Sequence, residues 1–269
     1  MRPASKSNPH STDARHGRPL VVALARGLDV LRCFEPGERY LGNQEISRRI
    51  GVPKPTVTRL TQTLTDLGYL RYAEHEGKYA LSTGVLSLGF SALAHSDIRR
   101  LARPLMQALA EHTQAAVNLG VRDRLSMMYV DRYRTASTYS VELDVGSHVP
   151  LGDSAMGRAY LSAIPEKDRS GLLDAIRKSD PARWPELKRA LETSFREYQD
   201  KGYCLNLGYW RPEVHAIAVT LIPADGSEPT GFSCSGAAYQ LGREKLEEEI
   251  GPRLFTLVGN VRAALASAR

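Results

Sequence analysis

The feature that most constrains the fold is a turn rich in glycine and proline between two apolar helical repeats. The first repeat places apolar residues four apart after Asn43, which we expect to cap that helix at its start. Gly51 then interrupts the pattern at a point where a left-handed backbone forms easily. Because proline lacks the N–H that goes unpaired in a first helical turn, Pro53 and Pro55 predict the start of a second helix.

The second helix has an apolar side and a polar side. Its apolar stripe recurs at helical spacing and consists of Val57, Leu60, Leu64 and Leu67. The opposite face carries Pro55, Thr58, Arg59, Gln62 and Asp66. A helix that reads DNA must present such a face to a major groove about 12 Å wide, so the pair predicts a helix-turn-helix. The alternative is an ordinary helical hairpin with a solvated polar side.

The segments on either side favour the DNA-binding interpretation. Residues 21–34 predict a preceding helix that packs onto the other two. Its apolar stripe consists of Leu24, Leu28 and Leu31. Residues 69–73 and 78–81 predict two short strands joined through Gly77. Three helices followed by a hairpin is the order of a winged helix-turn-helix, in which we interpret the wing first as cover for the core and second as a weak DNA contact.

The positive charge of the chain supports this assignment. The net charge is +6, and most of it lies in the first 80 residues. Such an excess favours binding to a polyanion, with an affinity that falls as salt rises. The residues that we expect to contact double-stranded operator DNA are Lys54, Pro55, Thr56, Thr58, Arg59 and Gln62 on the second helix, with Arg26 and Lys78 on phosphates.

The composition indicates a cytoplasmic protein that is not associated with a membrane. No apolar run is long enough for a signal peptide or for a span of about 20 residues. Three cysteines without close partners in the sequence suit a reducing compartment. Residues 1–19 are polar and interrupted by proline and glycine, so they predict a disordered arm.

The second half of the chain predicts a domain of strands and helices. Residues 84–113 predict two helical segments that meet near residues 95–97. The first has a broad apolar side and needs a partner, which is either the core of the second domain or a second subunit. Further strands are predicted at 116–121, 125–133, 138–143, 203–207, 215–222 and 231–235. Further helices are predicted from 154, at 166–178, at 185–201 and at 243–266.

Small residues gather at the start of the helix near Ser154. Gly152, Ala155 and Gly157 leave backbone N–H groups open at the positive end of this helix, where a carboxylate fits. Asp153 or Ser154 can cap it. The alternative is a close contact between the helix and the sheet that merely requires small residues.

Together these segments resemble the IclR family of bacterial transcription regulators over residues 20–266. The order and spacing of several motifs carry the resemblance. They are ALARGLDVLRCF at 23–34, QEISRRIGVPKPTVTRLTQTLTDLGYLRY at 44–72, YALSTGVLSLG at 79–89, PLGDSAMGRAYLSAIP at 150–165, GYCLN at 202–206, HAIAVTLIPADG at 215–226 and FSCSG at 232–236.

The resemblance implies an α+β chain with four parts. They are a disordered arm at 1–19, a winged helix-turn-helix domain at 20–82, a linker helix at 83–98 and a GAF-like mixed α/β effector-binding domain at 99–269. The implied function is that of a DNA-binding transcriptional regulator, with no enzymatic activity and no cofactor. It is expected to bind its operator as a dimer or a dimer of dimers under the control of a small-molecule effector, and both repressors and activators occur in the family.

The effector site is carried over from the family only where the motifs match. The matched positions are Ala155, Met156, Asn206, Ala216, Ser233 and Ser235. Strand alternation places the two serines on one side and Cys234 on the other. Two hydroxyls and an amide suit an oxygen-rich ligand, whereas a methionine and an alanine favour a more apolar one, such as an aromatic acid. Tyr129 can form an aromatic wall with Tyr209 or Trp210.

Two other classes of function are weighed against this interpretation. An enzyme would have to use Cys204, Cys234, His215 or the acids near Asp153, but no zinc-ligand or disulfide-exchange spacing occurs among them. No phosphate-binding loop or hydrolase motif is present either, and a histidine in an apolar strand is typical of a structural hydrogen bond. A thiol-based redox sensor that uses the two cysteines remains an alternative.

Overall fold

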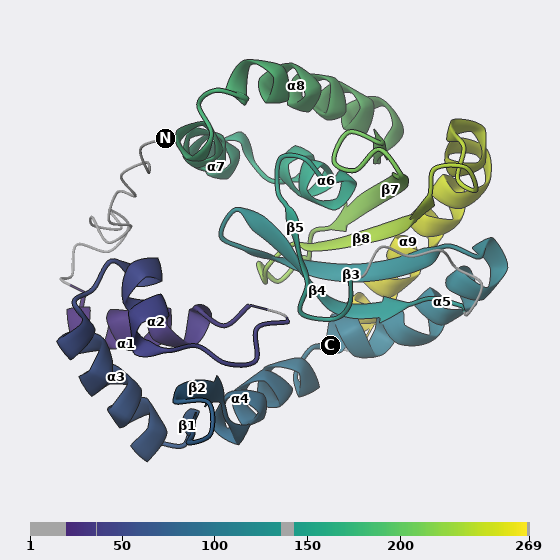
Figure 1. Cartoon of the computed structure of the whole chain (residues 1–269). Coiled ribbons are helices and arrows are strands. Elements are labelled where there is room, and N and C mark those ends of the chain that lie inside the picture. Colours follow the sequence, from purple (N-terminus) through teal and green to yellow (C-terminus); the bar gives the residue numbers. More distant parts are fainter. Residues whose placement is uncertain (1–19, 36, 136–142, 268–269) are drawn as a thin grey trace. The chain divides into compact units, whose positions relative to one another are not determined.

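The computed structural model describes residues 20–35, 37–135 and 143–267, which form two compact units (Figure 1). The first unit ends at His95 and the second begins at Ser96. The predicted arm at 1–19 and most of the predicted strand at 138–143 lie outside the described residues. Within the described residues, no helix combines the length and the apolar character needed to cross a membrane.

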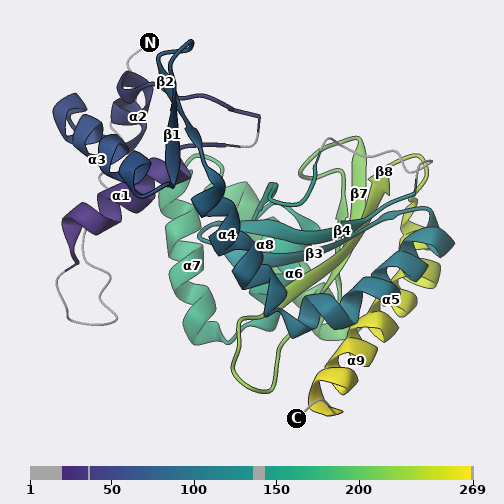
Figure 2. The same ribbon diagram turned by 90° about the horizontal axis from the view of Figure 1, so that it is seen from below.

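Four helices and a two-stranded hairpin make up the described part of the first unit. The elements are α1 (Val22–Arg32), α2 (Asn43–Ile50), α3 (Lys54–Asp66), β1 (Leu70–Ala73), β2 (Lys78–Leu81) and α4 (Thr83–Ala94). The two strands are antiparallel, and the hairpin stands beside α2 (Figure 2). The core consists of Val30, Cys33, Leu41, Ile46, Val52, Val57, Leu70 and Tyr79. The predicted winged helix-turn-helix is therefore confirmed.

The turn between α2 and α3 forms as the sequence predicts, but the cap of α2 does not. Gly51 has a φ of 66° and ends α2 in the left-handed conformation. The prediction that Asn43 caps α2 is wrong, because Asn43 is already helical and the N-cap is Gly42. The backbone N–H of Gly42 donates to the Glu45 carboxylate at 2.8 Å, which satisfies this end of the helix.

The leucine stripe of α1 is a second correction. Leu24 and Leu28 were expected to pack onto α2 and α3, but their side chains are 63% and 47% exposed. The buried positions at this point are instead Val30 and Cys33, which belong to the core cluster. Leu67 at the end of α3 is likewise exposed. The unit thus buries a different face of α1 and leaves an apolar surface uncovered.

The second unit is built on one antiparallel sheet in the order β5-β4-β3-β8-β7-β6. Its strands are β3 (Ala116–Asp123), β4 (Ser126–Tyr133), β5 (His148–Pro150), β6 (Cys204–Leu207), β7 (Val214–Leu221) and β8 (Thr230–Ala237). The short strand β5 was not predicted. The central strands are largely buried on both faces because helices cover the sheet on both sides.

The helices of the second unit form two layers around the sheet (Figure 1). One layer holds α6 (Ala155–Ala163), α7 (Glu166–Ser179) and α8 (Trp184–Lys201), and the other holds α5 (Asp97–Thr113) and α9 (Gly251–Ser267). The predicted closing helix begins with a π-helical segment, η1 (Lys245–Ile250). This mixed arrangement of helices and sheet confirms the predicted α+β class.

Candidate functional site

The polar face of α3 is exposed, and its side chains divide between two surfaces of the first unit. Lys54 and Gln62 border a concave surface that α2 and the hairpin also line, together with Lys78. Thr56 and Arg59 border an apolar groove against α1, together with Arg26. Pro55 and Thr58 are exposed between the two. Six of the eight predicted DNA contacts therefore lie on α3, and Arg26 and Lys78 each line one of the two surfaces beside it.

Some of the predicted contacts already have partners within the unit. Lys78 forms an ion pair with Glu45 at 3.3 Å, which ties the hairpin to α2. The Asn43 amide donates to the Thr58 hydroxyl at 3.2 Å, and Thr58 in turn donates to the Lys54 carbonyl at 3.0 Å. Asn43 therefore orients a residue of the recognition helix instead of capping α2.

One cation on the concave surface was not predicted. Arg48 is an exposed residue near the end of α2 and lines this surface with Lys54 and Lys78. Its neighbour Arg49 is held in a bidentate pair with Glu38 at 2.5 and 2.6 Å. The sequence offered one signal for this contact, which is a positively charged residue in the last turn of the first helix of the motif.

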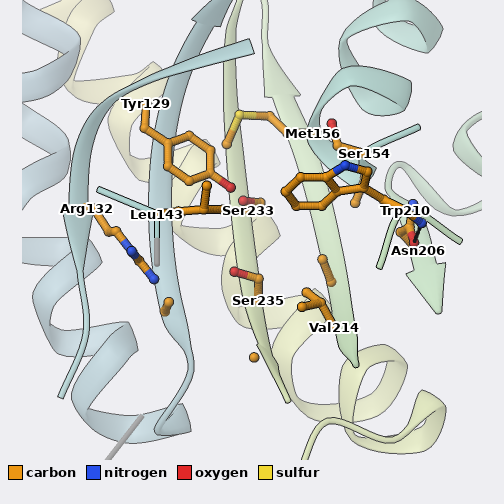
Figure 3. A pocket seen from close by; sticks show the side chains of 14 residues that line it. Tyr129, Arg132, Leu143, Ser154, Met156, Asn206, Trp210, Val214, Ser233 and Ser235 are labelled. Carbon is orange, nitrogen blue, oxygen red and sulfur yellow. Dashed lines mark hydrogen bonds between the residues drawn. The ribbon is translucent and has the colours of Figure 1, made fainter. Parts of the chain in front are cut away.

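A pocket opens in the second unit where the start of α6 faces β4, β7 and β8 (Figure 3). All six predicted effector positions line it: Ala155, Met156, Asn206, Ala216, Ser233 and Ser235. The space between atoms is about 640 Å³ including the mouth, but the centre of a water molecule can move through only about 40 Å³ of it. A ring-sized ligand therefore has to move a lining side chain as it enters.

Strand register explains why the two serines meet in the pocket. Ser233 pairs with Asn118 and Ser235 pairs with Ala216, so these positions share one face of the sheet. Cys234 lies between the serines in sequence, faces the other side and is fully buried. The predicted alternation of side chains between the two faces of β8 is therefore confirmed.

Met156 fills one side of the pocket by packing on two glycines of the sheet. A Cβ built at Gly120 would lie 2.5 Å from the Met156 sulfur, and one at Gly231 would lie 2.5 Å from its Cγ. Met156 is almost completely buried as a result. The sheet therefore accommodates this bulky side chain, which forms an apolar wall of the pocket.

Asn118 organises the serine hydroxyls and was not predicted. Its amide nitrogen lies 3.2 Å from the Ser233 hydroxyl and 3.1 Å from the Ser235 hydroxyl, and it donates to both. Because each hydroxyl oxygen accepts from Asn118, its own proton remains available for another acceptor. Ser233 also shares a hydrogen bond with the Tyr129 hydroxyl, so Ser235 is the serine that faces the pocket as a donor.

A β-bulge on β4 brings Arg132 into the pocket. Leu119 pairs with Asp131 whereas Gly120 pairs with Tyr129, so Val130 is an extra residue on β4. The bulge reverses the alternation, and Tyr129 and Arg132 lie on the same face although they are three positions apart. Both line the pocket. Strict alternation from Tyr129 would have placed Arg132 on the opposite face, which is why the sequence did not indicate it.

The residue beside this arginine faces the other layer of helices. Asp131 is buried, and its carboxylate lies 3.0 Å from the Arg99 guanidinium and 3.6 Å from that of Arg103, both on α5. Its other carboxylate oxygen accepts the backbone N–H of Arg132 at 3.0 Å. Adjacent residues of β4 therefore connect the pocket to the first turns of α5.

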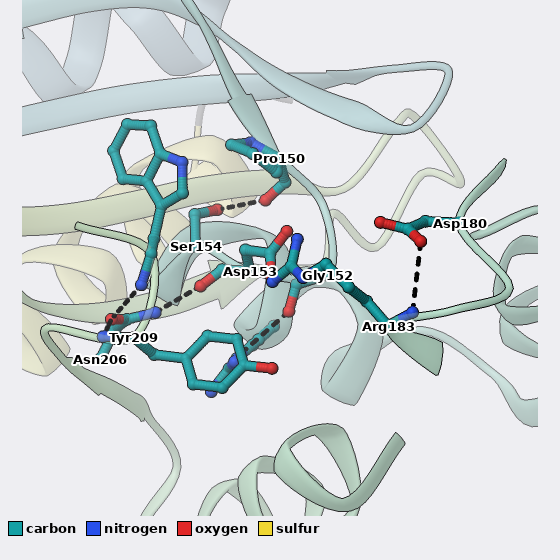
Figure 4. Close-up of polar contacts among 10 residues, drawn as sticks. Pro150, Gly152, Asp153, Ser154, Asp180, Arg183, Asn206 and Tyr209 are labelled. Atoms are coloured by element: carbon teal, nitrogen blue, oxygen red, sulfur yellow. Dashed lines mark hydrogen bonds and ion pairs between the residues drawn. The ribbon is translucent and has the colours of Figure 1, made fainter. Parts of the chain in front are cut away.

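Asn206 connects two parts of the chain that line the pocket (Figure 4). Its side-chain nitrogen donates to the Asp153 carbonyl, and its oxygen accepts the backbone N–H groups of Tyr209 at 3.0 Å and Trp210 at 3.4 Å. These bonds tie the loop that carries Trp210 to the start of α6. Internal bonds therefore use the oxygen and one N–H of this amide, and its second N–H remains for the predicted contact with a ligand.

The aromatic wall forms from Tyr129 and Trp210, both of which line the pocket. Tyr209 stacks instead on the buried guanidinium of Arg158, which lies 4.1 Å from the ring centroid. Arg158 also donates to the Gly152 carbonyl at 2.9 Å. Burial lowers the pKa of Arg158 and raises the pKa of Tyr129 to about 12, so the Tyr129 hydroxyl stays protonated at neutral pH.

The start of α6 is capped and tightly packed. The Ser154 hydroxyl accepts the N–H of Gly157 at 3.0 Å and donates to the Pro150 carbonyl at 2.7 Å, so Ser154 is the predicted cap. Asp153 is paired with Arg183 at 2.9 Å. A Cβ on Gly157 would lie only 2.1 Å from the Leu151 carbonyl oxygen. For Gly157 the structure therefore supports the alternative explanation of the small residues, which is a close packing contact.

The geometry of the cysteines disfavours a redox sensor. Cys204 and Cys234 are fully buried, and burial raises the pKa of the Cys204 thiol to about 12 and that of Cys234 further. Cys204 lies beside Ser162 of α6, on the opposite face of the sheet from Cys234. The Nδ1 of His215 donates a hydrogen bond to the Leu241 carbonyl at 2.8 Å, which confirms the predicted structural histidine.

Two family models match the chain. The IclR helix-turn-helix domain matches residues 23–74, and the bacterial transcriptional regulator IclR C-terminal model matches residues 90–259. The HTH-type transcriptional regulator TsaQ1/TsaQ2 of Comamonas testosteroni is 35% identical over 255 residues, which is 94% of this chain and 91% of that protein.

Solved structures share the architecture over nearly the whole chain. An IclR family transcriptional regulator from Brucella abortus is 43% identical with a TM-score of 0.86, covering 98% of this chain and 99% of that one. An IclR homolog from Microbacterium hydrocarbonoxydans, crystallised with 4-hydroxybenzoate, is 21% identical with a TM-score of 0.70, covering 91% of this chain and 99% of that one. Because this second structure is only 21% identical, its similarity supports the fold alone.

Proposed function

Because the chain belongs to the IclR family of bacterial transcriptional regulators, we propose that a small carboxylic acid in its effector-binding domain controls its binding to an operator. The observation that carries the proposal is a pocket that combines a guanidinium, two serine hydroxyls and an aromatic wall. The regulator acts in the cytoplasm, where the operator is. Its homologues are transcriptional regulators.

The proposed DNA contacts use both surfaces beside α3. Base contacts come from the exposed face of α3, with Arg59 and Gln62 in the major groove of the DNA. Lys54, Lys78 and Arg48 line one concave surface, and a phosphate backbone that follows it would meet three cations. Arg26 extends the contact on the α1 side.

We further propose that α1 and α4 pair with a second copy of the chain. Among the described residues, α4 buries no side chain within its own unit, and Leu86, Leu88 and Phe90 are 59%, 59% and 68% exposed. Leu24 and Leu28 of α1 add to this apolar surface. An apolar surface of this kind marks a protein interface, and a two-fold pair of DNA-binding units matches a palindromic operator.

The dimer is tested by placing a charge on this surface. Phe90→Glu is expected to weaken self-association by at least about tenfold, because a carboxylate buried in an apolar interface loses its hydration. Sedimentation equilibrium at several concentrations measures the effect. Ser170→Glu, which adds the same charge at an exposed position of α7, serves as the control. A Phe90→Glu protein with the wild-type dissociation constant would contradict the proposed interface.

The signal is proposed to pass from the pocket through β4 to α5. A ligand that shifts Arg132 also shifts the backbone N–H that bonds to Asp131. Asp131 in turn holds Arg99 on α5, the helix that follows α4 along the chain. A ligand changes operator affinity only if its own affinity differs between the two arrangements.

Asp131→Asn is expected to uncouple the two sites. Effector coupling of the usual size changes operator affinity by about 5- to 150-fold, and we expect the variant to reduce that change to less than about twofold. Operator binding and acid binding should each persist when measured alone. Fluorescence anisotropy with and without the acid tests this, with Asp174→Asn, from an exposed pair with Arg177 on α7, as the control. A full ligand response in Asp131→Asn would refute the route.

A further inference from the structure

We propose that Arg132 and Ser235 hold the carboxylate of the effector, so that the pocket selects compact monocarboxylic acids with an apolar ring or chain. This inference rests on the proposed effector control and assigns the end of the pocket at which the acid binds. Figure 3 shows Arg132 reaching from β4 toward Ser235, with Trp210 and Asn206 at the other end.

Charge is the first argument for this assignment. Of the described residues that line the pocket, Arg132 alone carries a charge. Its burial lowers its pKa, but a guanidinium still remains protonated at neutral pH. The planar guanidinium can donate two parallel hydrogen bonds to a carboxylate. A neutral ligand of the same shape cannot accept them in the same way.

The hydroxyls complete a set of donors at the same end. Asn118 donates to Ser233 and Ser235, and Ser233 also shares a hydrogen bond with the Tyr129 hydroxyl, so Ser235 is the serine that can direct its proton at a ligand. Tyr129, with its raised pKa, also keeps its proton. A cation and neighbouring O–H donors suit an acceptor that carries negative charge, and a carboxylate offers about four lone-pair sites.

The other end of the pocket has few polar groups to spare. The Asn206 amide is engaged with Asp153, Tyr209 and Trp210. The Ser154 hydroxyl is engaged with Gly157 and Pro150. What remains there is the apolar surface of Trp210, Met156 and Val214. Among the described residues no cation lines this end, so a second carboxylate there would lose hydration without an ionic partner, and we expect dicarboxylic acids to bind more weakly than monocarboxylic acids.

The inference is tested by calorimetry on the full chain with pairs of probes. The acids are benzoate, phenylacetate and pyruvate, each compared with its carboxamide, and terephthalate is the dicarboxylate. We expect at least one monocarboxylate to bind about tenfold or more tightly than its amide, and terephthalate to bind no better than that amide. A wild-type protein that binds no monocarboxylate, or binds acid and amide alike, overturns the inference.

Arg132→Gln separates an anchoring role from a structural one. It should weaken binding of the acid by about 10- to 100-fold while the amide changes by less than about twofold, because only the acid loses an ionic partner. Arg132→Lys should restore part of the preference, and Arg134→Gln, an exposed arginine on the same segment, should leave it intact. Equal losses for acid and amide, or a preference unchanged in Arg132→Gln, would overturn the assignment.

Ser235→Ala provides a second variant in case Arg132→Gln does not fold. It removes one donor hydroxyl and should also weaken the acid more than the amide. Operator affinity without ligand is measured on every variant. A variant that loses its preference for the acid but still binds the operator supports the assignment of the carboxylate anchor. A wild-type protein that fails to bind its operator would instead contradict the proposed function.

Discussion

Replacing Gly157 by alanine is expected to destabilise the Ser96–Arg269 unit by about 3 kcal/mol or more and to lower its melting temperature by about 6 to 12 °C. The added Cβ would lie 2.1 Å from the carbonyl oxygen of Leu151 and 2.5 Å from its Cα. Both are backbone atoms, so a side-chain rotation cannot relieve the overlap. The start of α6 must therefore move, and it carries two residues of the pocket.

The same substitution on α7 gives a control of opposite sign. Gly171 is exposed within α7, and a Cβ there meets no atom within 4 Å. Because alanine is favoured over glycine in a helix by about 1 kcal/mol, Gly171→Ala should raise stability slightly. Calorimetric unfolding of both variants measures the difference. A Gly157→Ala protein as stable as Gly171→Ala would contradict the packing described at the start of α6.

Arg59→Ala is expected to weaken specific operator binding by about 1 to 3 kcal/mol and to relax sequence choice at one base position. Arg59 is exposed on the polar face of α3, beside the α1 side of the helix. A guanidinium that donates two hydrogen bonds to a guanine edge discriminates strongly between base pairs. Competition binding with single-base operator variants measures both effects.

A phosphate contact should respond differently from a base contact. Lys78→Ala should weaken binding to all sequences alike and lower the slope of log affinity against log salt by about one. Arg177→Ala, an exposed arginine of the second unit, is the matched control and should change neither quantity. An Arg59→Ala protein with wild-type affinity and sequence preference would refute the role assigned to α3.

Local patterns predicted most of the elements because they depend on neighbouring residues. The spacing around Gly51 and Pro55 identified α2 and α3, since a left-handed glycine and a first-turn proline act within a few residues. Alternation likewise placed Ser233 and Ser235 together on β8. These features follow from backbone geometry that a short stretch of sequence determines.

The features that the sequence did not indicate depend on distant residues. The bulge at Val130 exists only in the register of β4 against β3, and it alone brings Arg132 into the pocket. The Asn118 amide meets two serines more than 100 residues away in sequence. The partners of Asn206 within the chain are backbone groups of a neighbouring helix start and loop.

The apolar stripe of α1 failed as a guide to burial for another reason. Leu24 and Leu28 have the spacing of a core stripe, yet they are exposed in the isolated chain. Periodicity indicates that a face needs an apolar partner but does not say which molecule supplies it. The proposed second subunit would give these side chains their cover.

The most direct test of the central claim is binding of the purified protein to its own upstream intergenic DNA, measured as a function of salt and with a panel of monocarboxylic acids. We predict specific binding whose affinity falls steeply as salt rises, and a shift in that affinity with at least one acid. Absence of specific binding at every salt concentration, with and without the acids, would contradict the assignment of this chain as an acid-controlled operator-binding regulator.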